Sequence, residues 1–83
     1  MDLLMNNTPQ NPNALLTREQ LATALTEAGF PVRAKTLATQ ASRGGGPPYR
    51  RFGPRVLYVW SEGLSWAHAR LSPPINSKEL SAA

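Results

Sequence analysis

Apolar residues recur at helical spacing in two neighbouring stretches of the chain. The first stretch predicts a helix over about residues 18 to 28, with its apolar positions at Leu21, Ala22, Leu25 and Ala28. Thr17 stands directly before this helix and Gln20 three residues later, a spacing that lets each side chain satisfy a free backbone N–H in a capping box. Gly29 follows the last apolar position and supplies the left-handed residue that commonly ends a helix.

The second stretch predicts a helix over about residues 34 to 42. Leu37 and Ala41 fall on one face of this helix, and the opposite face carries Lys35, Thr36 and Thr39. The Phe-Pro-Val sequence at residues 30–32 makes a tight apolar connection to the first helix, and the three glycines at 44–46 end the second. Two helices joined by a short turn, with a basic and hydroxyl-rich outer face, are the general plan of a helix-turn-helix.

The remainder of the patterned chain predicts a hairpin and a third helix. Two β-prone runs, Tyr49–Phe52 and Val56–Trp60, flank the turn-forming Gly-Pro-Arg sequence at 53–55, so the hairpin has a basic tip. The third helix is expected to start from a Ser61 cap and to end before Pro73, with inner positions at Leu64, Ala67 and Leu71. The predicted fold class is mainly α with a small β-hairpin.

Length and composition limit the functions open to this chain. Its 83 residues allow one small domain, expected over residues 15–72 between a flexible N-terminal arm (1–14) and a flexible C-terminal tail (73–83). The absence of cysteine excludes disulfides and Cys-based zinc sites, and the lone His68 with five carboxylates leaves little material for a metal site or an acid–base pair. We therefore expect no enzymatic activity, no metal and no cofactor.

The longest apolar run, residues 56–60, is far shorter than the roughly 20 residues that span a bilayer. The first residues lack the basic and apolar regions of a secretory signal. The sequence therefore predicts a cytoplasmic protein with no membrane partner.

Positive charge is concentrated in the middle of the chain. The formal net charge is +4. Residues 1–29 carry one base against three acids, and residues 61–83 carry two of each. Residues 30–60 carry no acid and six bases, namely Arg33, Lys35, Arg43, Arg50, Arg51 and Arg55. An unneutralised basic segment is typical of a protein that binds a polyanion such as nucleic acid, although a solvated basic face explains the charge equally well.

Several of these residues resemble one family of DNA-binding proteins. The matching segments are Leu15 to Ala22 (LLTREQLA), Thr36-Leu37, Gly46 to Tyr49 (GPPY), Arg55 to Tyr58 (RVLY) and Ser61-Glu62 before Trp66. Together they resemble the MerR-like winged helix-turn-helix group, which includes excisionases (recombination directionality factors) and AlpA-type regulators. The resemblance covers about residues 15–72, and the GPPY element with the strand that follows it is its most specific part.

The resemblance implies a function and a set of contacts. The second helix would enter the major groove through Arg33, Lys35, Thr36, Thr39 and Arg43. The hairpin, as a wing, would contact the backbone or minor groove through Arg50, Arg51 and Arg55. The implied protein is a nucleoid-associated excision factor from a bacterium or phage. It would bind and bend double-stranded attachment-site DNA cooperatively, through self-association of adjacent protomers, and direct an integrase toward excision. An AlpA-like transcription regulator would use the same surface.

The sequence also departs from the family pattern. Gln40 stands where the family often has a buried aromatic residue, and the second wing strand carries Leu57, Val59 and Trp60 where related wings alternate Arg or Lys. A strand with five successive apolar residues on a small hairpin either exposes some of them as a protein contact surface or has both faces covered. A third hypothesis is therefore a protein adaptor that uses this strand and binds no DNA.

The hairpin aromatics interleave with arginines, as in proteins that stack unpaired bases. So small a domain needs these rings to close its core, and we expect core packing for Tyr49 and Trp66 in particular. For His68, a surface or half-buried structural position is the better interpretation.

Overall fold

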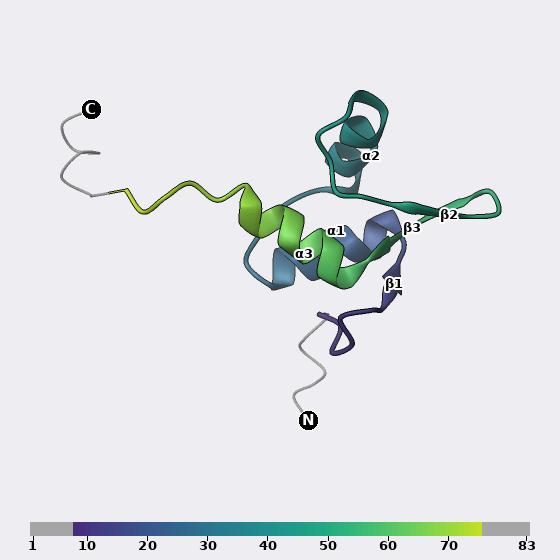
Figure 1. The fold of residues 1–83 in the computed structure, drawn as a ribbon, viewed down its shortest axis with the longest axis horizontal. Coiled ribbons are helices and arrows are strands. Elements are labelled where there is room, and N and C mark those ends of the chain that lie inside the picture. Colours follow the sequence, from purple (N-terminus) through teal and green to yellow (C-terminus); the bar gives the residue numbers. More distant parts are fainter. Residues whose placement is uncertain (1–7, 76–83) are drawn as a thin grey trace.

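The computed structural model describes residues 8–75, which form three helices and a three-stranded antiparallel sheet (Figure 1). The elements follow in the order β1 (Leu15–Leu16), α1 (Arg18–Glu27), α2 (Ala34–Arg43), β2 (Arg50–Phe52), β3 (Arg55–Val59) and α3 (Trp60–Ala69). This arrangement confirms a small, mainly helical fold with a hairpin. No helix among these residues is long and apolar enough to cross a membrane.

Helix α1 has the start and the end that its sequence predicts. The Thr17 side chain accepts from the Gln20 backbone N–H at 3.1 Å, and the Gln20 side chain accepts from the Thr17 N–H at 2.9 Å, which confirms the capping box. At the other end Gly29 has φ +106°, and the Phe30 N–H donates to the Leu25 carbonyl at 2.7 Å. This is the Schellman pattern, in which the glycine reverses the chain and spare helix carbonyls are satisfied.

A threonine closes the turn between α1 and α2. The Thr26 hydroxyl donates to the Val32 carbonyl at 3.2 Å and accepts from the Val32 N–H at 3.3 Å. Phe30 and Val32 are half-buried against the core. Helix α2 then runs to Arg43, where Gly44 takes a positive φ of 92° and ends it. Leu37 is the fully buried residue of α2 and anchors that helix to the core.

The sheet contains one strand that the sequence pattern did not predict. Its order is β1-β3-β2, with β3 paired to β2 in the expected hairpin and to the short β1 on its other edge. In β1, Leu15 pairs with Val59 and Leu16 with Tyr58. A two-residue strand is too short for an alternating pattern to reveal it.

Helix α3 begins at Trp60, so the prediction that Ser61 caps it was wrong. Its N-cap is Val59, which makes no side-chain capping bond. Instead, the Trp60 N–H donates to the Ala14 carbonyl at 2.9 Å and the Ser61 N–H to the Pro12 carbonyl at 2.8 Å. Backbone from the N-terminal segment thus satisfies two of the free donors at the start of α3. These two acceptors lie within the segment predicted to be the N-terminal arm.

Helix α3 also ends earlier than its predicted apolar stripe. Ala67 is buried and Leu64 packs against the core, but Leu71 lies beyond Ala69, the last residue of the helix, and is 60% exposed. The predicted inner position at Leu71 is therefore wrong. The outer portions of the predicted arm (1–7) and tail (76–83) lie outside the described residues.

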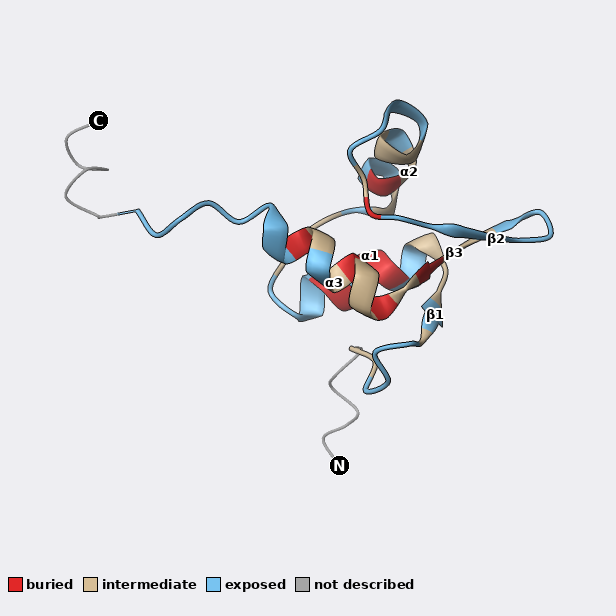
Figure 2. Cartoon of the chain, viewed as in Figure 1, coloured by how far each residue is buried: buried red, intermediate tan, exposed pale blue. Residues whose placement is uncertain are grey.

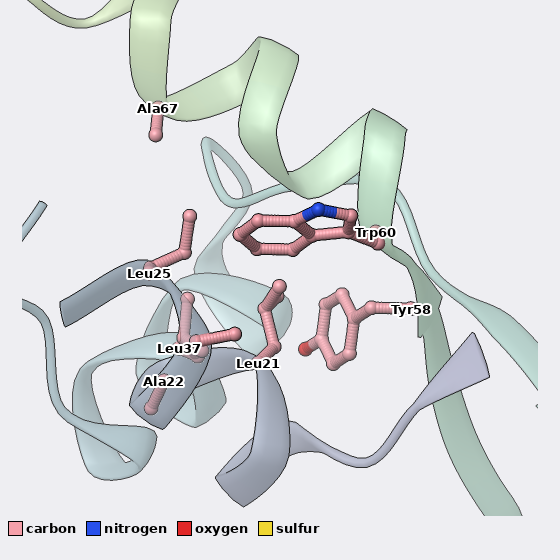
Figure 3. Packing of buried hydrophobic residues seen from close by; sticks show 8 residues of the cluster. Leu21, Ala22, Leu25, Leu37, Tyr58, Trp60 and Ala67 are labelled. Atoms are coloured by element: carbon pink, nitrogen blue, oxygen red, sulfur yellow. The ribbon is translucent and has the colours of Figure 1, made fainter. Parts of the chain in front are cut away.

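The core lies where α1, α3 and β3 meet (Figure 2). The largest fully buried side chains are Tyr58, Leu21, Leu25 and Leu37. The rings of Tyr58 and Trp60 converge on Leu21, as Figure 3 shows. The predicted apolar position at Ala28 is exposed, and the neighbouring Ala24 is buried in its place. Helix α2 and the β2–β3 hairpin project from this body, which places the basic segment at its periphery (Figure 1).

Candidate nucleic-acid interface

The outer face of α2 presents every polar residue predicted to lie there. Burial of Leu37 fixes the rotation of the helix about its axis, so the residues opposite it face solvent. All five candidate groove contacts are exposed, namely Arg33, Lys35, Thr36, Thr39 and Arg43. The structure therefore makes them available to a partner as one basic, hydroxyl-bearing strip.

Thr39 on this strip makes a hydrogen bond within α2. The Thr39 hydroxyl donates to the Lys35 carbonyl one turn earlier, at 3.1 Å. Its proton is thus committed to the helix, while its oxygen lone pairs and methyl group still face outward. Such a threonine can accept from an adenine or cytosine amino group or pack against a thymine methyl group, but it makes a poor donor to a base.

The three hairpin arginines are all exposed, but one of them has an ionic partner. Arg50 pairs with Leu57 in the strand register, and its guanidinium forms a salt bridge to Glu62 in the first turn of α3. Arg51 and Arg55 make no ion pair with any residue in the range 8–75. The ion pair joins the hairpin to α3, and within residues 8–75 Arg51 and Arg55 are the hairpin cations without an ionic partner.

The link between α2 and the hairpin is fixed at its glycines. The Trp66 Nε1 donates to the Gly45 carbonyl at 2.9 Å, and a Cβ placed on Gly46 would lie 2.9 Å from the Cβ of Gln40. Pro47 follows and is buried. These contacts hold the hairpin in a defined position relative to α2. They also give Trp66 the core-closing position predicted for it, half-buried against the core.

Gln40, the departure from the family pattern, is half-buried beside this link. Its Oε1 is buried and, within the described part of the chain, has no hydrogen-bond partner. An amide with an unmet acceptor seats a helix less firmly than a packed aromatic ring would. The unpaired Gln40 oxygen is therefore consistent with weaker packing of α2 against the rest of the protein.

The proposed apolar contact strip on β3 is only partly available. Leu57 and Val59 are half-exposed, but Trp60 is 6% exposed because it begins α3 and points into the core. The prediction of Trp60 as a protein contact was therefore wrong. Tyr58, on the opposite face of β3, is fully buried, so one face of the strand is covered and the face of Leu57 and Val59 stays partly exposed, which favours the first of the two alternatives considered for this strand.

The hairpin aromatics do not form a stacking platform. Tyr58 is fully buried and Trp60 nearly so. Tyr49 is 38% exposed with its ring centroid 6.1 Å from that of Tyr58, so its predicted burial in the core was wrong. Phe52, in contrast, is 70% exposed. Its position directly before the Gly53-Pro54 turn was the signal in the sequence for this exposure.

The single histidine, His68, has a structural contact. His68 is exposed and packs edge-on against Phe30, with ring centroids 4.9 Å apart, which confirms the structural interpretation of this residue. No group of three or more His, Asp or Glu side chains in this range could hold a metal ion.

One basic residue has a structural task that the sequence analysis missed. The Arg18 Nε donates to the Tyr58 hydroxyl at 3.1 Å, and its guanidinium carbon lies 5.9 Å from the Tyr58 ring centroid. A cation in the first turn of a helix opposes the helix dipole. This unfavourable position of a cation was the signal in the sequence that Arg18 interacts with a residue outside its own helix.

Comparison of the chain with protein-family models, curated proteins and solved structures gave no match. Functional assignment therefore rests on the exposed basic face of α2, the arginines of the hairpin and the resemblance carried by the quoted motifs.

Proposed function

We propose that this protein is a non-catalytic, sequence-specific DNA-binding protein of the winged helix-turn-helix kind. In this proposal α2 is the recognition helix and the β2–β3 hairpin is the wing. The observation that carries it is the exposure of all six bases of residues 30–60, a segment that contains no acid. Only Arg50 is engaged in an ion pair among the described residues, through Glu62. A surface of this kind attracts phosphates, the dominant source of affinity for DNA.

The dimensions of α2 suit a major groove. With its side chains an α-helix is about 10–12 Å across, and the major groove of B-DNA is about 12 Å wide. Arg33 and Lys35 lie at the N-terminal end of α2, where a recognition helix usually contacts base edges. The hairpin arginines are suited to phosphates, since such contacts fix register without reading sequence.

Within this class we propose an excision factor that binds adjacent sites beside an attachment core, bends the duplex and directs an integrase. The resemblance to excisionases supports this choice, together with the half-exposed Leu57 and Val59, which could contact a neighbouring protomer on DNA. A transcription regulator would use the same surface, and the two differ in the position of their sites. The adaptor hypothesis loses its strongest residue with the burial of Trp60.

A gel-shift titration on DNA flanking the protein's own gene, against scrambled duplex, tests the proposal. If about six phosphates are neutralised, the slope of log affinity against log salt is roughly −5, a loss of about a thousandfold between 50 and 200 mM salt. Binding that ignores salt or does not prefer the native fragment overturns the proposal. Sites beside an attachment core favour the excision factor, and sites confined to a promoter favour the regulator.

Two variants separate DNA binding from the adaptor hypothesis. Combined replacement of Arg50, Arg51 and Arg55 by Ala should abolish the shift, because it removes the cations of the hairpin while leaving the core intact. Leu57→Ser should leave the first shifted species in place and weaken only the cooperative steps. Circular dichroism confirms that each variant is folded. An adaptor would show the reverse sensitivity in binding to its protein partner.

A further inference from the structure

Phe52 is the most exposed large apolar side chain among residues 8–75. It is 70% exposed. In contrast, the ring of Tyr58 on the same hairpin is buried, and so is the ring of Trp60, where the hairpin meets α3. Phe52 is the last residue of β2 and pairs with Arg55 across the turn, at the end of the hairpin farthest from the body (Figure 1). Core packing therefore does not explain why a phenylalanine occupies this position.

The tip that carries Phe52 is a tight two-residue turn. Two residues, Gly53 and Pro54, join β2 to β3, and Gly53 has φ +62°. A glycine of positive φ at the first central position is typical of a type II′ turn, and proline fixes the φ of the second position. The aromatic ring is thus carried beside a tight turn at the end of a two-stranded projection.

The surroundings of Phe52 are positively charged. Arg51 precedes it, Arg55 lies opposite it, and alternation places Arg50 on the same sheet face. Contact between two copies of this tip would bring like charges together, which disfavours self-association there. A polyanion, in contrast, would neutralise Arg51 and Arg55 while the ring made its own contact.

We infer that Phe52 is an apolar wedge that enters the minor groove of duplex DNA and inserts between neighbouring base pairs. Wedges of this type partly unstack a base step and kink the duplex, and the cost of unstacking is offset by the additional contacts that bent DNA makes. Arg51 and Arg55 would hold the phosphates on either side. The inference rests on the proposed function and assigns its DNA bending to one side chain.

The wedge also implies a preference at the step beneath the tip. Pyrimidine–purine steps such as TA and CA unstack most readily, so insertion there costs least. Specificity would then arise at a step whose base edges the protein does not read. The preference in affinity for duplexes with such a step should disappear when Phe52 is replaced by Ala.

The test uses end-labelled duplexes carrying a fluorescent donor and acceptor, with full-length protein at saturating concentration and low salt. Wild-type protein should raise energy transfer by bending the DNA, Phe52→Ala should bind without this rise, and Phe52→Leu should keep part of it. Affinity should fall roughly tenfold for Phe52→Ala, and a duplex kinked in advance by an unpaired base should restore it. Ile75→Ala, which removes another exposed apolar side chain (57% exposed), should behave as wild type.

The outcomes separate the wedge from the proposed function. If wild-type protein does not bind duplex at low salt, the proposed function fails and the wedge fails with it. If wild-type protein binds but saturated Phe52→Ala bends DNA equally, the wedge alone is overturned. Strand pairing and alternation place Leu15 and Phe52 on the same face of the sheet. If Phe52→Ala and Leu15→Ala both abolish self-association in sedimentation without DNA, this face binds a second copy and the wedge is likewise overturned.

Discussion

The Arg18 guanidinium donates its Nε–H to the Tyr58 hydroxyl at 3.1 Å and so joins the first turn of α1 to the central strand of the sheet. Tyr58 is fully buried, yet its hydroxyl has a partner, as buried polar groups require. The same guanidinium lies within cation–π distance of the ring. Arg18, one of the nine basic residues of the chain, thus stabilises the fold and is not assigned to a ligand.

Tyr58→Phe should lower the free energy of unfolding by about 1 kcal/mol, since it removes this hydrogen bond and keeps the ring. Urea denaturation followed by circular dichroism measures the change. A double-mutant cycle with Arg18→Ala should give a coupling energy of similar size. Tyr49→Phe is the matched control because Tyr49 is 38% exposed, and equal losses for the two tyrosines would contradict the assignment.

Thr17→Ala should destabilise the protein by about 1 kcal/mol, because Thr17 holds the Gln20 N–H at the start of α1. Thermal unfolding gives the measurement. Thr23→Ala, at an exposed position inside the same helix, should be neutral or slightly stabilising since alanine is the better helix former. A Thr17→Ala protein as stable as the Thr23→Ala protein would show that the capping box contributes nothing.

Gly63→Ala should destabilise the protein by about 1 kcal/mol or more despite the helix preference of alanine. A Cβ at this position would lie 2.7 Å from Leu21 Cδ1, and Leu21 is fully buried and cannot swing aside freely. Ser65→Ala, at an exposed position two residues along α3, is the comparison variant. Stabilisation by Gly63→Ala in chemical denaturation would mean that α1 and α3 pack less closely than they do here.

Glu62→Gln should strengthen DNA binding and steepen the salt slope by about 0.9, because it releases the Arg50 cation for a phosphate. Its effect on folding should be small, since exposed ion pairs contribute about 0.2–1 kcal/mol and one oxygen of this carboxylate is buried without a partner in the described chain. Glu27→Gln makes the same charge change at an exposed site in the last turn of α1. Equal slopes for the two variants would leave Arg50 outside the interface.

The sequence predicted those elements whose signals are local. The capping box at Thr17, the stop at Gly29 and the anchor at Leu37 depend on spacing within one or two turns, and each has the predicted place. Exposure of the α2 strip follows from the same periodicity. The hairpin is likewise signalled locally, by its Gly53-Pro54 turn.

The features that the sequence did not reveal depend on contacts between distant residues. Strand β1 exists because β3 offers it an edge, and Ser61 is not a cap because Trp60 enters the core one residue earlier. The pairing of Arg50 with Glu62 and the burial of Trp60 also require the fold to be known. Residue type alone distinguishes neither a free arginine from a paired one nor a surface tryptophan from a core one.

The carbonyls of Pro12 and Ala14, which accept from the first two amides of α3, have a consequence for synthesis on the ribosome. Helix α1, its turn and α2 depend on nearby residues and can form as the chain emerges. Pro12 and Ala14 are made well before α3, so their carbonyls must wait for the first turn of α3 before they accept these hydrogen bonds. The earliest described segment to be synthesised is therefore among the last to reach its final position.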